Sequence, residues 1–238
     1  MELPKEKIEP TSISPRSILI FGQAKVGKTT AVANLESNLI LDFDDGTRSI
    51  KALKIHIKDF TQLREVLTEI KNQGKPYKYI TVDTVSKLES MCEELALKMY
   101  QKTTMGKAYK GGILELPQGG GYYYLRKAVK IVLEEIGDSA DRIILIGHLK
   151  DKFIEKEGKE FTVREVDLAG KLASIICAEV DATAYMYRDK NKAVLNFACG
   201  ETLIAGSRQK HLFGKEIVIS EEDEKGKITY YWDSIFID

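Results

Sequence analysis

The segment that most constrains this chain is a short apolar run followed at once by a glycine-bounded loop and a lysine. Residues 17–21 read Ser-Ile-Leu-Ile-Phe, and residues 22–30 read Gly-Gln-Ala-Lys-Val-Gly-Lys-Thr-Thr. The second stretch matches the G-x-x-x-x-G-K-[ST] pattern of a phosphate-binding loop. A tight loop of this kind holds a polyphosphate by pointing several backbone N–H groups at it. The pattern predicts a buried strand, a nucleotide-binding P-loop and the start of a helix.

Each position of this loop has an expected role. Gly22 and Gly27 supply the curvature. Lys28 reaches the β- and γ-phosphates as a point charge, and the Thr29 hydroxyl is placed to ligate Mg²⁺. ATP and Mg²⁺ are therefore the expected cofactors. The predicted nucleotide-binding residues are Gly22, Gln23, Ala24, Lys25, Val26, Gly27, Lys28, Thr29 and Thr30, with Thr30 at the α-phosphate.

Composition narrows the class of protein. A chain of 238 residues with 43% hydrophobic residues can bury the core of a single α/β domain. Because 36 basic residues balance 36 acidic ones, any contact with nucleic acid must be local. The charged amino terminus and the lack of a long apolar run predict a cytoplasmic protein with no membrane partner. The three widely spaced cysteines, Cys92, Cys177 and Cys199, are expected to be reduced and buried.

Two further apolar runs end in acidic residues. Residues 38–42 and 79–83 predict buried parallel strands. The first is followed by Asp44 and Asp45, and the second ends in Asp83. In P-loop proteins an acid at the end of a neighbouring strand holds Mg²⁺ through water, which is the Walker B role expected of Asp83. Alternatively, Asp83 only caps the next helix. Residues 86–89 predict a capping box at the start of that helix.

The least regular part of the chain is residues 101–121, which are rich in glycine. Long loops inside a compact domain are usually functional or disordered. Lysines that track phosphates, together with an aromatic ring that stacks on bases, suit single-stranded nucleic acid. On composition alone, a solvated flexible loop with core tyrosines at the start of the next helix is favoured over this interpretation. The candidate nucleic-acid contacts are Lys102, Lys107, Tyr109 and Lys110.

The second half of the chain alternates strands and helices. Residues 142–148 predict a strand that ends in His148, and residues 149–166 are a charged segment, either an exposed hairpin or a binding loop. The remaining predicted elements are helices at 122–136 and 168–179, strands at 182–188 and 193–198, and a hairpin formed by 216–219 and 228–232. Residues 1–15 contain three prolines and predict an extended arm, either a loose terminus or a segment that docks on a neighbouring subunit.

The order of these parts resembles the RecA-like core ATPases, and in particular the small phage members that act as single-strand-annealing or recombination proteins. The likeness spans residues 16–212. Four stretches carry it: the P-loop, Leu41-Asp42-Phe43-Asp44-Asp45-Gly46, residues 80–88 and residues 143–152. The resemblance implies that Asp44 orients the attacking water, where the family usually has Glu, with Asp45 as a substitute. It implies that His148 senses the γ-phosphate, where RecA has Gln.

The resemblance also implies an assembly. Residues 101–121 and 149–166 correspond to the two DNA-binding loops of the family. Arg208 and Lys210 resemble the basic side chains that one protomer inserts into its neighbour's nucleotide site, although a solvated basic turn is the alternative for them.

We therefore expect a RecA-like P-loop fold, an α/β architecture with a mainly parallel sheet flanked by helices and a β-hairpin at the carboxyl end. Residues 16–238 form a single domain, of which 206–238 are β-rich. The expected function is that of a Mg²⁺-dependent ATPase that forms a homo-oligomeric ring or filament and binds single-stranded DNA for annealing or recombination. The alternative is a nucleotide-switched assembly or regulatory protein with a protein partner and no nucleic acid.

Overall fold

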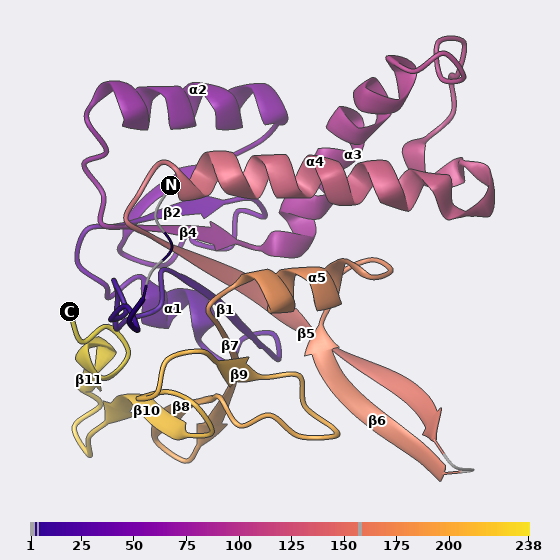
Figure 1. The fold of residues 1–238 in the computed structure, drawn as a ribbon. Coiled ribbons are helices and arrows are strands. Elements are labelled where there is room, and N and C mark those ends of the chain that lie inside the picture. Colours follow the sequence, from indigo (N-terminus) through magenta and orange to yellow (C-terminus); the bar gives the residue numbers. More distant parts are fainter. Residues whose placement is uncertain (1–2, 4, 157–158) are drawn as a thin grey trace.

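A mixed sheet forms the centre of the molecule. The computed structural model describes residues 3, 5–156 and 159–238. The strand order is β11-β10-β8-β7-β1-β5-β4-β2-β3, and the strands from β7 to β3 run parallel (Figure 1). The parallel strands are β1 (Ser17–Gly22), β2 (Asn38–Asp42), β3 (Leu53–His56), β4 (Tyr79–Asp83), β5 (Arg142–Lys156) and β7 (Ala182–Asp189). The antiparallel side contains β8 (Lys192–Asn196), β10 (Glu216–Glu222) and β11 (Ile228–Tyr230), while β6 (Lys159–Val166) pairs with β5 and β9 (Gly206–Ser207) with β7.

Helices cover both faces of the sheet. One face packs against α2 (Phe60–Asn72), α3 (Val85–Gln101), α4 (Gly120–Gly137) and α5 (Leu172–Glu179). The other packs against α1 (Lys28–Val32) and the carboxyl-terminal segment that contains the 3₁₀ turn Trp232–Ser234. Strand β1 supplies both layers, because successive side chains point to opposite faces. Leu19 and Phe21 lie in the first core and Ile18 and Ile20 in the second.

Strand register brings the predicted polar residues to one edge of the sheet. Asp42 at the end of β2 is paired with Asp83 at the end of β4. Gly22, where β1 enters the P-loop, is paired with His148 of β5. Since parallel strands end at the same edge, the P-loop, the acids and the histidine converge there.

Two parts of the chain project from the sheet (Figure 1). Helices α3 and α4 extend beyond it and are joined through short 3₁₀ turns at Ile113–Glu115 and Pro117–Gly119. Strand β5 continues past the sheet and pairs with β6 in a long antiparallel hairpin. The described residues of the charged segment at 149–166 therefore form the hairpin of the two predicted alternatives, while residues 157 and 158 lie outside the described part of the chain.

The architecture predicted from the sequence is confirmed, with local corrections. Strand β3 was not predicted, and helix α5 begins at Leu172 rather than at residue 168. The capping box at 86–89 is wrong, since α3 begins after Thr84 and the Glu89 carboxylate accepts a hydrogen bond from the Ala169 N–H. Cys199 is exposed because it lies in the loop after β8, whereas Cys92 is buried as expected and Cys177 is partly buried.

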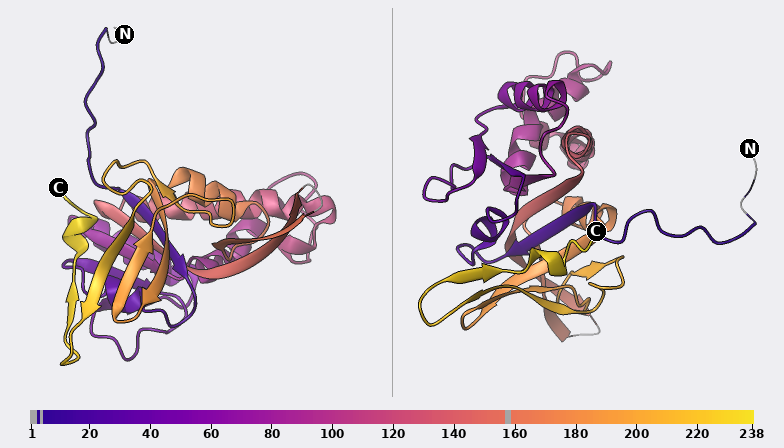
Figure 2. Two further views of the ribbon diagram at one scale, coloured as in Figure 1. Left: turned by 90° about the horizontal axis from the view of Figure 1, so that it is seen from below. Right: turned by 90° about the vertical axis from the view of Figure 1, so that its left-hand side faces the viewer.

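The segment just before β1 contacts the carboxyl-terminal segment beside the sheet. The Ser14 hydroxyl accepts a hydrogen bond from the Ile237 N–H at 2.8 Å. The amino-terminal arm leads away from the body of the molecule (Figure 2). Closer to the P-loop, the Trp232 indole donates to the Ala31 carbonyl at 3.0 Å and ties the carboxyl-terminal segment to α1. Among the described residues, none of the helices has the length and apolarity needed to cross a membrane.

Candidate nucleotide-binding site

The P-loop backbone explains both of its glycines. A methyl group at Gly22 would lie 2.4 Å from the Met186 carbonyl oxygen on β7, which is closer than any side chain tolerates. Gly27 has a φ of 104°, a conformation that side chains with a Cβ rarely adopt. The chain thus needs glycine at these positions to bend the loop against β7.

Lys28 is drawn into the loop. Its side chain is 6% exposed, and the Nζ atom donates to the carbonyl oxygens of Gly22 at 2.9 Å and Gln23 at 2.8 Å. Burial lowers the pKa of Lys28 to about 8, although the nearby Asp83 carboxylate acts in the opposite direction. The ammonium group is therefore held at the mouth of the loop, where it can meet a phosphate oxygen.

Asp83 and Thr29 form a pair of oxygen donors beside the lysine. The Thr29 hydroxyl donates to Asp83 Oδ2 at 2.6 Å. Burial, together with the charges of Asp44 and Asp42, raises the pKa of Asp83 to about 6, while the hydrogen bond from Thr29 and the charge of Lys28 act in the opposite direction. Mg²⁺ prefers such hard oxygen ligands, and a buried carboxylate near other acids gains most from a cation. The donor set fits the expected Mg²⁺, with Thr29 and Asp83 as the residues that would hold it.

These groups surround a cavity of about 290 Å³ at the carboxyl edge of the sheet. Asp44 lines this cavity, whereas Asp45 pairs with Arg48 outside it. A larger groove of about 890 Å³ lies between α2 and α3, away from the P-loop. The residues that line the smaller cavity are Lys25, Gly27, Lys28, Thr29, Thr30, Asp44, Gly46, Ile50, Asp83, Thr84, Ile146 and His148.

Arg188 is a neighbour of the P-loop that the sequence analysis missed. Its Nε atom donates to the Val26 carbonyl at 3.4 Å, and its guanidinium group lies close to Gly27. Arg188 stands near the end of β7 and is 162 positions away from Val26. The available signal was a basic residue near the carboxyl end of a buried strand, which is weak without knowledge that β7 lies beside β1.

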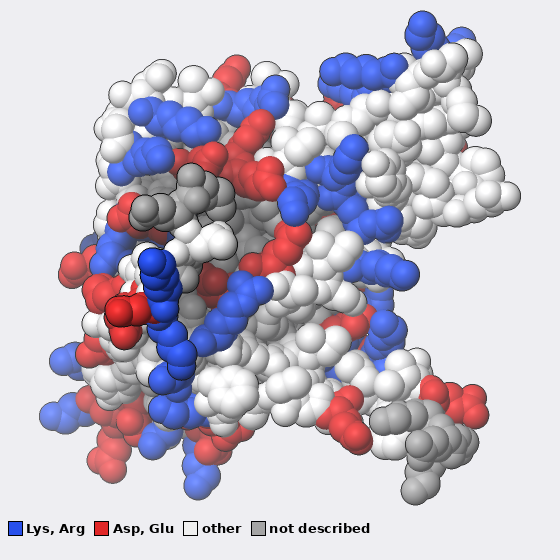
Figure 3. Space-filling view, in the orientation of Figure 1, with Lys and Arg blue, Asp and Glu red and all other residues white. Residues whose placement is uncertain are grey.

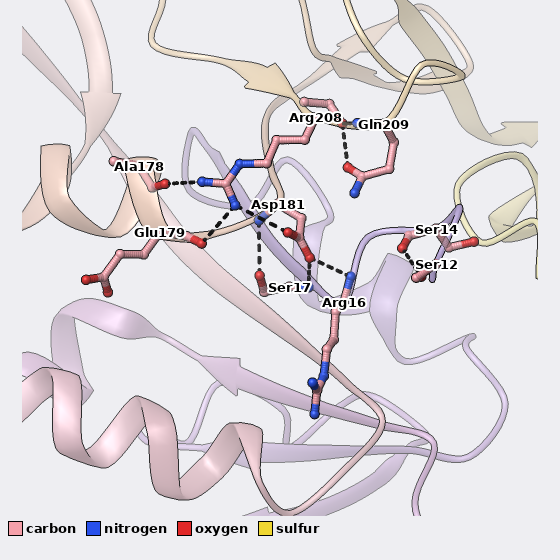
Figure 4. A network of polar contacts seen from close by, with 10 residues as sticks. Ser12, Ser14, Arg16, Ser17, Ala178, Glu179, Asp181, Arg208 and Gln209 are labelled. Carbon is pink, nitrogen blue, oxygen red and sulfur yellow. Dashed lines mark hydrogen bonds and ion pairs between the residues drawn. The ribbon is translucent and has the colours of Figure 1, made fainter. Parts of the chain in front are cut away.

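Arg208 and Lys210 lie outside the cavity. Strand β9 ends at Ser207, so neither residue stands on a strand. Arg208 donates to the Ala178 carbonyl at 2.5 Å and forms an ion pair with Asp181 at 3.4 Å (Figure 4). Lys210 is exposed.

The Asp181 network lies at the edge of the sheet opposite the P-loop. Asp181 accepts hydrogen bonds from the N–H groups of Arg16 at 2.8 Å and Ser17 at 3.2 Å, where β1 begins (Figure 4). Arg208 thereby joins the end of α5 to the start of β7. Its predicted action on a neighbour's nucleotide stays a prediction, since it concerns another subunit.

The candidate nucleic-acid contacts lie in the α3–α4 lobe. Lys102, Lys107 and Lys110 are exposed. The Tyr109 ring packs edge-on against Tyr100 with centroids 5.4 Å apart, and its hydroxyl donates to the Gly112 carbonyl at 2.9 Å. Tyr109 therefore serves the packing of the lobe, and the lysines keep exposed charge. Basic side chains also line this side of the molecule between the lobe and the β5–β6 hairpin (Figure 3).

Known proteins resemble the chain at different levels. No curated protein sequence matches it. The crystal structure of the RadB recombinase superposes with a TM-score of 0.46 at 10% identity, over 92% of this chain and 92% of that chain. A KaiC-like protein, PH0186 from Pyrococcus horikoshii OT3, superposes with a TM-score of 0.46 at 12% identity, over 91% of this chain and 89% of that one. The family model described as an AAA domain matches residues 14–209, which include the whole lining of the cavity, so the chain belongs to this family of P-loop ATPases.

Proposed function

We propose that this P-loop ATPase is a Mg²⁺-dependent enzyme of the RecA-like core type that oligomerises and binds single-stranded DNA for annealing or recombination. The observation that carries the ATPase part is the convergence of Lys28, Thr29, Asp44, Asp83 and His148 on one cavity. A basic group, a metal-binding pair and a further acid are what phosphoryl transfer to water requires.

The residues of the cavity divide the work of hydrolysis. Lys28 binds the β- and γ-phosphates of ATP, and Thr29 and Asp83 hold Mg²⁺, which neutralises phosphate charge when bound. Asp44 orients a water molecule for in-line attack on the γ-phosphorus and accepts its proton. The bond from this phosphorus to the β,γ-bridging oxygen breaks, and ADP and inorganic phosphate are released. His148 contacts the γ-phosphate and relays its loss to the β5–β6 hairpin, because His148 lies on β5, the strand that continues into the hairpin.

Two measurements test the ATPase. The purified protein should hydrolyse ATP only with Mg²⁺ present, and Asp44→Asn should lower kcat by at least about 100-fold while nucleotide still binds. Asp45→Asn is the matched control, because Asp45 pairs with Arg48 rather than lining the cavity. Full turnover in Asp44→Asn, together with loss of turnover in Asp45→Asn, would mean that Asp45 and not Asp44 orients the water.

The proposed DNA contact rests on the exposed lysines of the α3–α4 lobe. Replacing Lys102, Lys107 and Lys110 by alanine should weaken binding to labelled single-stranded DNA and reduce its salt dependence, because fewer counterions are released. The control makes the same charge change at exposed lysines elsewhere, Lys71, Lys75 and Lys225. Equal losses in the two triple variants would show that net charge alone matters, and no DNA binding at low salt would reject the contact.

Assembly is proposed to place Arg208 and Lys210 of one subunit at the nucleotide site of the next. In that case Lys210→Ala should reduce turnover and particle size together. Mixing Lys210→Ala with an Asp44→Asn variant should restore part of the activity, because some interfaces then combine two intact halves. If the mixture has only the average activity of the two variants measured separately, the shared site is rejected.

One observation favours the second candidate, a nucleotide-switched regulatory protein with a protein partner. A groove of about 180 Å³ between α4 and α5 has mainly apolar walls, which include Leu133, Leu172 and Ile175, and its lining also contains Arg126, Lys127, Lys130 and Glu179. Apolar grooves of this kind suit a protein segment better than a phosphate backbone. ATP-dependent binding of DNA in the assay above, unaffected by Ile175→Gln in the partly exposed wall of the groove, would count against this candidate.

A further inference from the structure

A buried acid supports the loop that carries Asp44. Asp42 is the last residue of β2 and is 1% exposed. Its Oδ1 atom accepts hydrogen bonds from the N–H groups of Asp44 and Gly46, both at 3.2 Å. Its Oδ2 atom accepts from the N–H of Thr47 at 3.0 Å and from the Thr47 hydroxyl at 2.5 Å. The carboxylate thus binds the backbone at Asp44 itself and at Gly46 and Thr47, which follow it.

The same loop is held at its two ends by the strands. The Phe43 N–H donates to the Asp83 carbonyl at 2.8 Å, which joins the loop after β2 to the end of β4. The Lys54 ammonium donates to the carbonyls of Thr47 and Ile50, the latter at 2.9 Å. Because these bonds cross between β2, β3 and β4, the loop conformation depends on the packed strands as well as on its own residues.

Three side chains at this loop have the arrangement of a possible metal site. Asp42 and Asp45 come within 4.8 Å of His56 and resemble a metal-binding group. The Asp42 oxygens, however, already accept the hydrogen bonds of the loop, and Asp45 pairs with Arg48. Hydrogen bonds of backbone N–H groups to a buried carboxylate are charge-assisted and therefore strong. These hydrogen bonds account for the buried position of Asp42 as a support for the loop, and a metal ion is not needed to explain it.

We infer that Asp42 and Thr47 are positioning residues for Asp44. Asp44, Gly46 and Ile50 line the nucleotide cavity, whereas Asp42 and Thr47 lie beneath it and are 1% and 3% exposed. Asp42 holds the Asp44 and Gly46 N–H groups, and the Thr47 hydroxyl ties the end of the loop to the same carboxylate. The Asp44 carboxylate, whose Oδ1 atom also accepts a hydrogen bond from the Gly46 N–H at 3.2 Å, is thereby held beside the cavity. This inference rests on the proposed function of Asp44 in ATP hydrolysis.

Thr47 offers a matched pair of variants. Thr47→Val keeps the shape of the side chain and removes the hydroxyl, while Thr47→Ser keeps the hydroxyl. Thr47→Val should lower kcat for ATP hydrolysis about tenfold and leave the Kd for Mg²⁺ and a non-hydrolysable ATP analogue within about twofold. Thr47→Ser should keep kcat within about twofold of the wild type. Equal kcat values for the two variants, or a change in Kd alone, would overturn the inference.

A positioning role also predicts non-additivity. If Thr47 acts through Asp44, adding Thr47→Val to Asp44→Asn should not lower kcat further, because the oriented carboxylate is already lost. A tenfold fall in both backgrounds would mean that Thr47 acts by another route, and the inference would be wrong. Lys54→Met is a second way to release the loop, since it leaves Asp42 and Thr47 in place, and it should lower kcat with the same non-additivity. An additive effect of Lys54→Met would also count against the inference.

A measurement without turnover separates this inference from the proposed function. Hydrogen exchange of the backbone between residues 43 and 47 should be faster in Thr47→Val than in Thr47→Ser, with unchanged exchange in β1. Identical exchange rates in the two variants would reject the inference that the Thr47 hydroxyl supports the loop, whatever the ATPase activity of the variants. An inactive wild-type protein whose loop is protected as expected would instead reject the ATPase proposal alone.

Discussion

Replacing Asp83 by asparagine should stabilise the nucleotide-free protein. Asp83 is 4% exposed, and burial with the charges of Asp44 and Asp42 raises its pKa from 3.8 to about 6. An acid whose folded-state pKa is raised penalises the folded state once it ionises. The penalty is absent below the unfolded-state pKa, grows between pH 4 and 6, and is complete above about pH 6.

The size of this effect follows from the two pKa values. Their difference, from 3.8 to about 6, corresponds to as much as about 3 kcal/mol, since one pKa unit is worth about 1.4 kcal/mol. Asparagine keeps the shape of the side chain and a carbonyl oxygen that can accept the Thr29 hydroxyl. Asp83→Asn should therefore raise the free energy of unfolding by up to about 3 kcal/mol at pH 8, and by about half of that at pH 5.

Urea unfolding in EDTA at pH 5 and pH 8 measures this gain. With Mg²⁺ and ATP present the order should reverse, because the wild type gains stability from the bound metal and nucleotide whereas Asp83→Asn loses a ligand for the metal. Lower stability of the variant at pH 8, or the same gain at both pH values, would refute the assignment of a buried, destabilising carboxylate to Asp83.

Further substitutions test the packing around the site. Gly22→Ala should abolish nucleotide binding, measured with a fluorescent ATP analogue, because the added methyl group would lie 2.4 Å from the Met186 carbonyl oxygen. Arg208→Ala should lower the free energy of unfolding by about 1–2 kcal/mol in urea, since carbonyls at the end of α5 lose their donor; unchanged stability would assign Arg208 no role within the subunit. Trp232→Phe should cost about 1–2 kcal/mol in the same assay, because the Ala31 carbonyl loses the buried indole donor; a neutral result would mean that water replaces it.

Much of the nucleotide site was accessible from the sequence because its signals are short-range. The P-loop motif depends on the spacing of Gly22, Gly27 and Lys28, and the acids at Asp44 and Asp83 stand directly after apolar runs that the sequence marks as strands. A strand followed by an acid or a loop shows which end of that strand faces a site, without knowledge of its neighbours.

Other features could not be read from local patterns. Glu89 has the spacing of a capping box with Ser86, yet its carboxylate accepts a hydrogen bond from Ala169, 80 positions away. Burial beside Ala169 decides between the two partners, and burial depends on the packing of α3 against the segment before α5. The same limit applies to strand β3, whose exposed residues lack the apolar pattern of a central strand.

The sequence by itself determined the chemistry of this protein, namely a polyphosphate-binding loop with a lysine, a threonine and strand-terminal acids. The order of the strands was decided by the tertiary structure alone. That order sets His148 beside Gly22, brings Arg188 to the P-loop and puts Arg208 at the opposite edge of the sheet. The physical reason is that a motif is defined along the chain, whereas neighbours across a sheet are chosen by the burial of both faces of every strand at once.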